Sequence, residues 1–294
     1  MSEFPTHHLS EHYKTIVILK VAEHVLECRL NTPKNMNAMT PLFWGEIGDF
    51  FSRIADDGET RAVVLTAAGK LFTAGLDLKE GAGTLQATYE DVGRQALALR
   101  RHVISWQDAF TAIEKCGKPV IICVHGPCIG AGLEMASACD IRLCSADAYW
   151  AMKEVDIGLA ADVGGLQRFP KVVGNQSIVR ELALTGRKLL ANEALSLGFV
   201  SAVLPDVAAM RSRGLEIACT IASKSPIATL GTKHLLNYTR DHTVDEALDY
   251  TITWNQAMLQ STDIGISVGA FLSKQKPTFD NLPSAPPSKL KAKL

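Results

Sequence analysis

The chain has 294 residues, of which 47% are hydrophobic and 21% are charged, and its formal net charge is −1. This composition predicts one globular domain with a substantial core, and it excludes the basic field that a nucleic-acid-binding protein requires. No apolar run reaches the roughly 18 residues of a membrane span. Seven cysteines lie scattered without a CxxC pair, which predicts reduced core thiols rather than a metal site.

The first hundred residues alternate short apolar strands with helical segments. Residues 1–12 are polar, lack a secretory pattern and are predicted to be a flexible N-terminus. A helix should begin after Thr40, its N-cap, and run to about residue 54. Residues 81–86 are expected to be a small-residue link. Residues 89–114 have helical periodicity, with one apolar side packed mainly in the core. We predict strands over residues 15–19, 25–30 and 61–66.

The most informative stretch begins with an apolar run, residues 120–124, which is short enough for a buried strand. Small residues follow between Gly126 and Gly132, and residues 133–138 have helix-forming character. A strand that runs into a glycine-rich turn and a helix start presents free backbone N–H groups. Such groups can hold a phosphate or an oxyanion that develops during a reaction.

Three acids follow this turn, and each lies in otherwise apolar sequence, where a lone carboxylate is costly to bury. Glu134 lies at the start of the predicted helix, where interaction with the helix dipole is the alternative role. Glu154 follows a strand predicted over residues 148–152, and its alternative role is a surface ion pair with Lys153. Asp162 lies among small residues and has a helix N-cap as its alternative role.

The second half of the chain changes character after Pro205. Strands are predicted over residues 141–144, 148–152 and 199–204, and helices over 175–185, 192–197, 208–223, 227–238 and 244–273. Alternating strands and helices followed by helices alone predict an α/β core over residues 13–205 and a helical region over residues 206–275. Residues 276–294 contain several prolines and a lysine-rich end, which predicts a flexible tail.

The glycine-rich turn, the two glutamates after it and the third acid together resemble the crotonase family, also called the enoyl-CoA hydratase/isomerase superfamily. The resemblance covers roughly residues 12–275 and is greatest to the Δ3,5-Δ2,4-dienoyl-CoA isomerases. Its most specific part is residues 153–175, which include the Ala-Asp-Val-Gly of residues 161–164. The resemblance implies a spiral of ββα turns with C-terminal helices that form a homotrimer or hexamer. It also implies an acyl-CoA thioester substrate and no separate cofactor, because CoA enters as part of the substrate.

The resemblance also implies roles for individual residues. The backbone N–H groups of Leu76 and Ala131 correspond to the two donors of an oxyanion hole, although Ala131 departs from the glycine common in the family. Glu154 corresponds to the base at carbon 2, and Asp162 corresponds to the acid that protonates carbon 6 in a 1,5-proton shift. Both acids are expected to take part, and which of them serves which carbon stays open.

Glu134 makes the implied reaction ambiguous. Dienoyl-CoA isomerases usually carry aspartate at the matching position, whereas hydratases carry glutamate and use it with the second glutamate to activate water. The favoured interpretation is a dienoyl-CoA isomerase in the β-oxidation of unsaturated fatty acids, because a hydratase does not require Asp162. The alternative is an enoyl-CoA hydratase, and a third hypothesis is a non-catalytic acyl-CoA-binding subunit.

The chain ends in Ala292-Lys293-Leu294, a one-residue variant of the Ser-Lys-Leu peroxisomal signal. We therefore expect recognition by a peroxisomal import receptor and a peroxisomal location. A mitochondrial or cytoplasmic location is the alternative.

Overall fold

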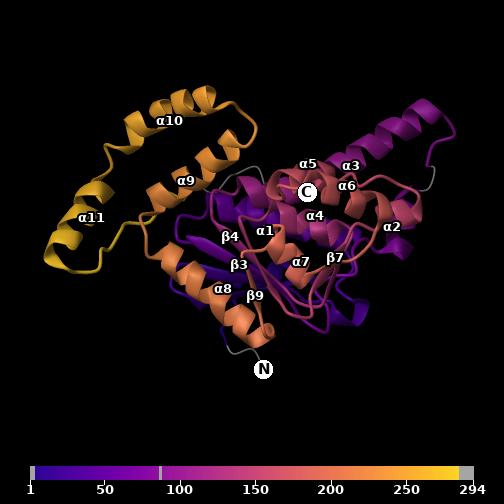
Figure 1. The fold of residues 1–294 in the computed structure, drawn as a ribbon, viewed down its shortest axis with the longest axis horizontal. Coiled ribbons are helices and arrows are strands. Elements are labelled where there is room, and N and C mark those ends of the chain that lie inside the picture. The colour runs from indigo at the N-terminus through magenta and orange to yellow at the C-terminus, as the bar shows by residue number, and fades with distance from the viewer. Residues whose placement is uncertain (1–3, 86–87, 285–294) are drawn as a thin grey trace.

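The computed structural model describes residues 4–85 and 88–284 and is built on a six-stranded sheet (Figure 1). The first two strands form an antiparallel hairpin, and each later strand pairs parallel with its neighbour. Parallel neighbours require crossover connections, which the helices of this fold supply. In spatial order the strands are β1 (Ile16–Ala22), β2 (Val25–Leu30), β3 (Ala62–Ala67), β4 (Val120–Val124), β6 (Ile141–Ser145) and β9 (Ala202–Leu204).

The central strands are buried on both faces, which explains their continuous apolar sequences. In β3, Val63 and Leu65 belong to the larger core, whereas Val64 faces the smaller one. The larger core lies against helix α1 (Pro41–Asp56), and the smaller core contains residues of α8 (Val207–Ala222). All seven cysteines are free and only Cys219 is exposed, which confirms the prediction of unpaired, mainly buried thiols.

A second, smaller layer lies beyond the main sheet and was only partly predicted. It contains β5 (Pro127–Ile129), β7 (Tyr149–Ala151) and β8 (Leu189–Leu190). Two isolated β-bridges lie outside these strands: Thr73 pairs with Cys128, and Met39 pairs with Leu76. Successive turns of the chain thus place one strand in the large sheet and a short segment in or beside the small layer, before entering a helix. This is the expected spiral of ββα turns.

Several helix ends follow local sequence signals. The Thr40 hydroxyl accepts a hydrogen bond from the Phe43 N–H at the start of α1. Helix α6 (Gln176–Thr185) begins after the capping residue Asn175 and ends at Gly186, which has a left-handed conformation.

No helix within residues 4–85 and 88–284 combines the length and the apolar character needed to cross a bilayer. The remaining helices of the core are α2 (Leu78–Leu85), α3 (Val92–Lys115), α4 (Ala131–Ala138), α5 (Gly165–Val172) and α7 (Ala191–Ser196), with short 3-10 helices at His8–His12, Pro33–Asn35 and Glu154–Ile157.

Two predictions for the segment between β3 and β4 were wrong. Residues 81–86 were expected to be a link, but most of them belong to α2, whose first turn is capped by the Asp77 carboxylate. The apolar side of α3 was expected to pack mainly in the core, but its first half projects from the body (Figure 1), and Val92 is 81% exposed. Burial of α3 is concentrated from Trp106 onward, where the helix reaches α1.

The C-terminal helices form an arm that leaves the body, as Figure 1 shows. It consists of α9 (Pro226–Thr239), α10 (Val244–Met258) and α11 (Thr262–Ser273). The prediction of one helix over residues 244–273 was wrong, because the chain turns after α10 and Ser261 caps a new helix. Exposed apolar side chains occur along α10 and α11: Val244, Leu248, Ile252, Ile264, Val268, Phe271 and Leu272.

Both terminal segments contact the body in their described parts. The Ser10 hydroxyl accepts a hydrogen bond from the Ile18 N–H, although residues 1–12 were expected to be flexible. The Arg61 guanidinium donates to the Ala222 carbonyl, where the arm leaves, and to the Phe279 carbonyl, where the chain returns. The predicted signal Ala292-Lys293-Leu294 lies outside the described residues.

Candidate active site

One cavity of about 220 Å³ brings the five predicted site residues together. The residues come from four separate segments, because Ala131 and Glu134 both belong to α4. Most of the remaining cavity wall is apolar and includes Trp44, Trp106, Ile129, Leu159 and Val163. The five predicted residues are Leu76, Ala131, Glu134, Glu154 and Asp162.

The two predicted N–H donors lie on segments of the chain that approach each other closely. Gly75 precedes Leu76 and has a φ of +84°, and a Cβ atom there would lie 2.7 Å from the Ile129 carbonyl oxygen. Only glycine therefore allows this loop to approach the strand that leads to Ala131. Neither the Leu76 nor the Ala131 N–H donates to another backbone group described in the structure. Both residues line the cavity, so these donors can serve a substrate oxygen.

Ala131 is the first residue of α4, and its side chain forms part of the cavity wall. An N–H in the first turn of a helix has no acceptor within the helix, and the helix dipole favours negative charge beside it. The methyl group, which stands where the family commonly has glycine, narrows the space next to this donor.

Glu134 is 1% exposed and bonds to the backbone that carries Asp162. Its Oε2 atom accepts hydrogen bonds from the N–H groups of Val163, at 3.1 Å, and Gly165, at 2.6 Å. Burial, and after it the charge of Glu154, raise the pKa of Glu134 to about 8, although the Gly165 N–H acts in the opposite direction. A carboxyl group with this pKa retains a proton near neutral pH.

Glu154 begins a 3-10 helix directly after β7, and burial raises the pKa of its carboxyl group. Its Oε2 atom is buried and has no hydrogen-bond partner among the described residues. Lys153 pairs with Asp156 at 2.7 Å, so the alternative of a surface pair between Lys153 and Glu154 was wrong. An unpartnered carboxylate oxygen in an apolar cavity is suited to accept a proton from a substrate.

Asp162 lies at the rim of the cavity and is exposed, whereas Glu134 and Glu154 lie deeper. Although the residue as a whole is exposed, the neighbouring cavity wall removes part of the solvent around its carboxyl group and raises the pKa of that group. The alternative role as a helix N-cap was wrong, because α5 begins at Gly165 with Gly164 at the cap and no capping side chain. The Asp162 carboxyl group therefore has no capping bond to break when it moves a proton.

The resemblance implied that the helical segment over residues 89–114 also lines the acyl pocket, but sequence reasoning did not identify the stacked tryptophans of the cavity wall. Trp44 of α1 and Trp106 of α3 stack with their ring centroids 5.3 Å apart and their planes 21° apart. Both side chains line the cavity and both are buried. The two residues are far apart in the sequence and meet only because α1 packs against α3, so no local pattern could have paired them.

Comparison with known proteins agrees with this geometry. The sequence model of the enoyl-CoA hydratase/isomerase family matches residues 20–282. The chain belongs to this family. Among the solved structures of related enzymes, the enoyl-CoA hydratase of Bacillus anthracis superposes with a TM-score of 0.82 at 28% identity, covering 90% of this chain and 99% of that one. The crotonase-type fold implied by the resemblance is thereby confirmed.

Within the enoyl-CoA hydratase/isomerase family, several curated relatives carry one name. The mitochondrial Δ(3,5)-Δ(2,4)-dienoyl-CoA isomerase of Rattus norvegicus is 50% identical over 269 residues, which cover 91% of this chain and 82% of the relative. The peroxisomal Δ(3,5)-Δ(2,4)-dienoyl-CoA isomerase of Arabidopsis thaliana is 41% identical and covers 92% of this chain and 99% of its own length.

Proposed function

We propose that this protein is a Δ3,5-Δ2,4-dienoyl-CoA isomerase that acts in the β-oxidation of unsaturated fatty acids. The observation that carries the proposal is a single apolar cavity with two available N–H donors, a buried unpartnered carboxylate oxygen on Glu154 and a second acid, Asp162, at the rim. The names of the rat and Arabidopsis relatives support it.

In the proposed reaction the thioester oxygen accepts hydrogen bonds from the N–H groups of Leu76 and Ala131. These bonds stabilise the negative charge that develops when the Glu154 carboxylate removes a proton from carbon 2. The electron pair of that C–H bond spreads over the thioester and the diene as far as carbon 6. The Asp162 carboxyl group then donates a proton to carbon 6, so that the double bonds move from positions 3 and 5 to positions 2 and 4.

The two acids return to their starting states by exchanging protons with solvent. The reaction has no net redox change and transfers only protons, so it requires no cofactor besides the CoA of the substrate. Glu134 supports this chemistry in two ways. It holds a proton beside Glu154, which reduces the repulsion between the two carboxyl groups, and it bonds to the backbone next to Asp162.

The alternative function is an enoyl-CoA hydratase, which one observation favours. Glu134 and Glu154 lie in the same cavity and interact strongly enough to shift each other's protonation. Two adjacent carboxyl groups can activate a water molecule for addition to a double bond. A non-catalytic acyl-CoA-binding subunit has no use for such a costly buried pair, so this third hypothesis is not supported.

Parallel assays distinguish the two enzymatic functions. Purified protein is incubated with 3,5-dienoyl-CoA and, separately, with 2-enoyl-CoA, and the ultraviolet absorbance of the conjugated products and substrates is followed. Faster turnover of 3,5-dienoyl-CoA, with formation of the 2,4-diene, supports the isomerase. Hydration of 2-enoyl-CoA without diene formation would replace it with the hydratase.

We also propose that the protein is a homotrimer or a hexamer assembled through the arm. The apolar side chains exposed on α10 and α11 support this proposal, because monomeric proteins rarely expose such extended apolar surface.

For its location we propose the peroxisome, with Ala292-Lys293-Leu294 recognised by an import receptor. The Arabidopsis relative is named as peroxisomal and the rat relative as mitochondrial, so family membership alone is compatible with either compartment.

A further inference from the structure

The Asp162 carboxyl group extends from a short segment, residues 161–165, whose backbone is held from two sides. From α3, the side-chain amide of Gln107 donates a hydrogen bond of 2.6 Å to the Asp162 carbonyl oxygen. From α4, Glu134 accepts hydrogen bonds from the N–H groups of Val163 and Gly165. Bonds on both sides of one residue fix its backbone, and therefore the origin of its side chain.

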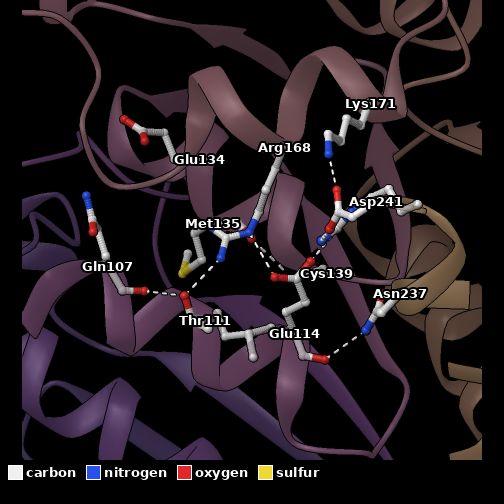
Figure 2. A network of polar contacts seen from close by, with 12 residues as sticks. Gln107, Thr111, Glu114, Glu134, Met135, Cys139, Arg168, Lys171, Asn237 and Asp241 are labelled. Atoms are coloured by element: carbon white, nitrogen blue, oxygen red, sulfur yellow. Dashed lines mark hydrogen bonds and ion pairs between the residues drawn. The ribbon is translucent and has the colours of Figure 1, made fainter. Parts of the chain in front are cut away.

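A third contact comes from Arg168 in the first turn of α5. A Cβ atom on Gly164 would lie 1.9 Å from Nη1 of Arg168, so the guanidinium group packs directly against the segment. Figure 2 shows how the guanidinium group is held in turn by α3: it donates to Glu114 at 3.1 Å and to the Thr111 hydroxyl at 2.9 Å. Helix α3 thus acts on the segment directly through Gln107 and indirectly through Arg168.

We propose that Gln107 and Arg168 are positioning residues that set the reach of the Asp162 carboxyl group toward carbon 6 of the diene. Neither side chain is among the residues that line the cavity in the described chain, so they act on the substrate only through Asp162. The proposal rests on the proposed isomerase function. It gives the two residues control over how often the intermediate is protonated at carbon 6 rather than returned to the starting diene.

Both residues can be replaced without leaving a buried charge unpaired. Gln107 is exposed, and leucine preserves the helix-forming character of its position. Arg168 shares Glu114 with Arg240, which pairs with the other carboxylate oxygen. In an Arg168→Met variant Glu114 therefore keeps one cationic partner, and the large penalty of an isolated buried carboxylate is avoided.

A double-mutant cycle with Asp162→Asn tests the proposal. The rate at which 3,5-dienoyl-CoA is converted to the 2,4-diene is measured for the wild type, for Gln107→Leu, for Arg168→Met, for Asp162→Asn and for both double variants. Because small displacements of a reacting group cost large factors in rate, each single positioning variant should lower kcat about tenfold with KM nearly unchanged. In the Asp162→Asn background the same replacements should change the remaining rate by less than about twofold.

Two variants serve as matched controls. Asp108→Asn alters the exposed neighbour of Gln107 on α3, and Lys171→Met removes the exposed ion pair with Asp241 one turn beyond Arg168. Both should retain the wild-type rate.

An equal loss in both backgrounds would mean a general structural effect and would overturn the proposal, as would unchanged rates in both single variants. If the wild type does not convert 3,5-dienoyl-CoA to the 2,4-diene, the proposed function fails first and this inference with it.

Discussion

Glu134 and Glu154 occupy the same cavity with contrasting hydrogen bonds. Oε2 of Glu134 accepts two backbone N–H groups, whereas Oε2 of Glu154 is buried without a partner in the described part of the chain. Burial and the neighbouring charge raise the pKa of Glu134 to about 8. The two residues therefore have different roles. Glu134 keeps a proton and bonds to the backbone beside Asp162, whereas Glu154 offers an unpartnered oxygen as the base.

We predict that the Glu134→Gln variant loses less stability than the wild type as the pH rises. The pKa of Glu134 is about 8 in the folded chain, above its ordinary value of 4.5, so the folded state binds this proton more tightly. The resulting stability is fully present below pH 4.5 and is lost as the pH rises through about 8. A neutral glutamine does not ionise, so its Tm should fall less between about pH 5 and about pH 9. Parallel Tm curves for the two proteins would contradict the raised pKa.

Replacing Ala131 by valine should impair the oxyanion hole without removing its N–H group. Two added methyl groups would crowd the thioester oxygen at a position that is 7% exposed and lines the cavity. We expect kcat/KM to fall about 10²-fold, the scale of losing one oxyanion donor. Ala131→Gly retains the N–H group and should remain active, and Tm measurements exclude unfolding as the cause. Full activity in a folded Ala131→Val protein would place the thioester elsewhere.

A charge on the arm should disrupt assembly. Phe271 of α11 is 82% exposed and lies beside the exposed Leu272. Burying an unpaired carboxylate in a protein interface is costly, so Phe271→Asp should shift the oligomer toward monomers in sedimentation velocity. Ser212→Asp, on an exposed position of α8, adds the same charge and should leave the oligomer intact. A wild-type protein that sediments as a monomer would refute the assembly.

Deletion of residues 292–294 should leave a fluorescently tagged protein in the cytosol, because the predicted signal is read at the free C-terminus. The tag is placed at the N-terminus, and the cells must contain no untagged copy that could carry the truncated chain into the organelle. Peroxisomal import of the truncated protein under these conditions would show that this tripeptide is not the signal.

The fold was predictable where local chemistry decides it. The predicted N-cap Thr40 caps α1, and the helix predicted over residues 175–185 forms as α6. The break before α11 was missed because apolar periodicity continues across it, although Ser261 is a capping residue. The three-residue strand β5 has no strong signal of its own, since only its pairing with β7 defines it.

The candidate site was predictable to a different extent. Resemblance to a family supplied Glu134, Glu154, Asp162 and the two N–H donors, and all of them line one cavity. It did not supply Gln107 or Arg168, because their contacts to residues 161–165 arise from the packing of α3 against the start of α5. Such contacts between segments distant in the sequence leave no pattern in either segment alone.

The central claim is that Asp162 delivers the proton to carbon 6. The rate at which the Asp162→Asn variant converts 3,5-dienoyl-CoA to the 2,4-diene tests it most directly. Asparagine preserves the size of the side chain but cannot donate a carboxyl proton. Because the Asp162 side chain is exposed and caps no helix, Tm should change little. We predict that conversion of 3,5-dienoyl-CoA falls about 10²–10⁴-fold, while any hydration of 2-enoyl-CoA, which depends on Glu134 and Glu154, is retained. Conversion by Asp162→Asn at the wild-type rate would contradict the 1,5-proton shift and favour the hydratase.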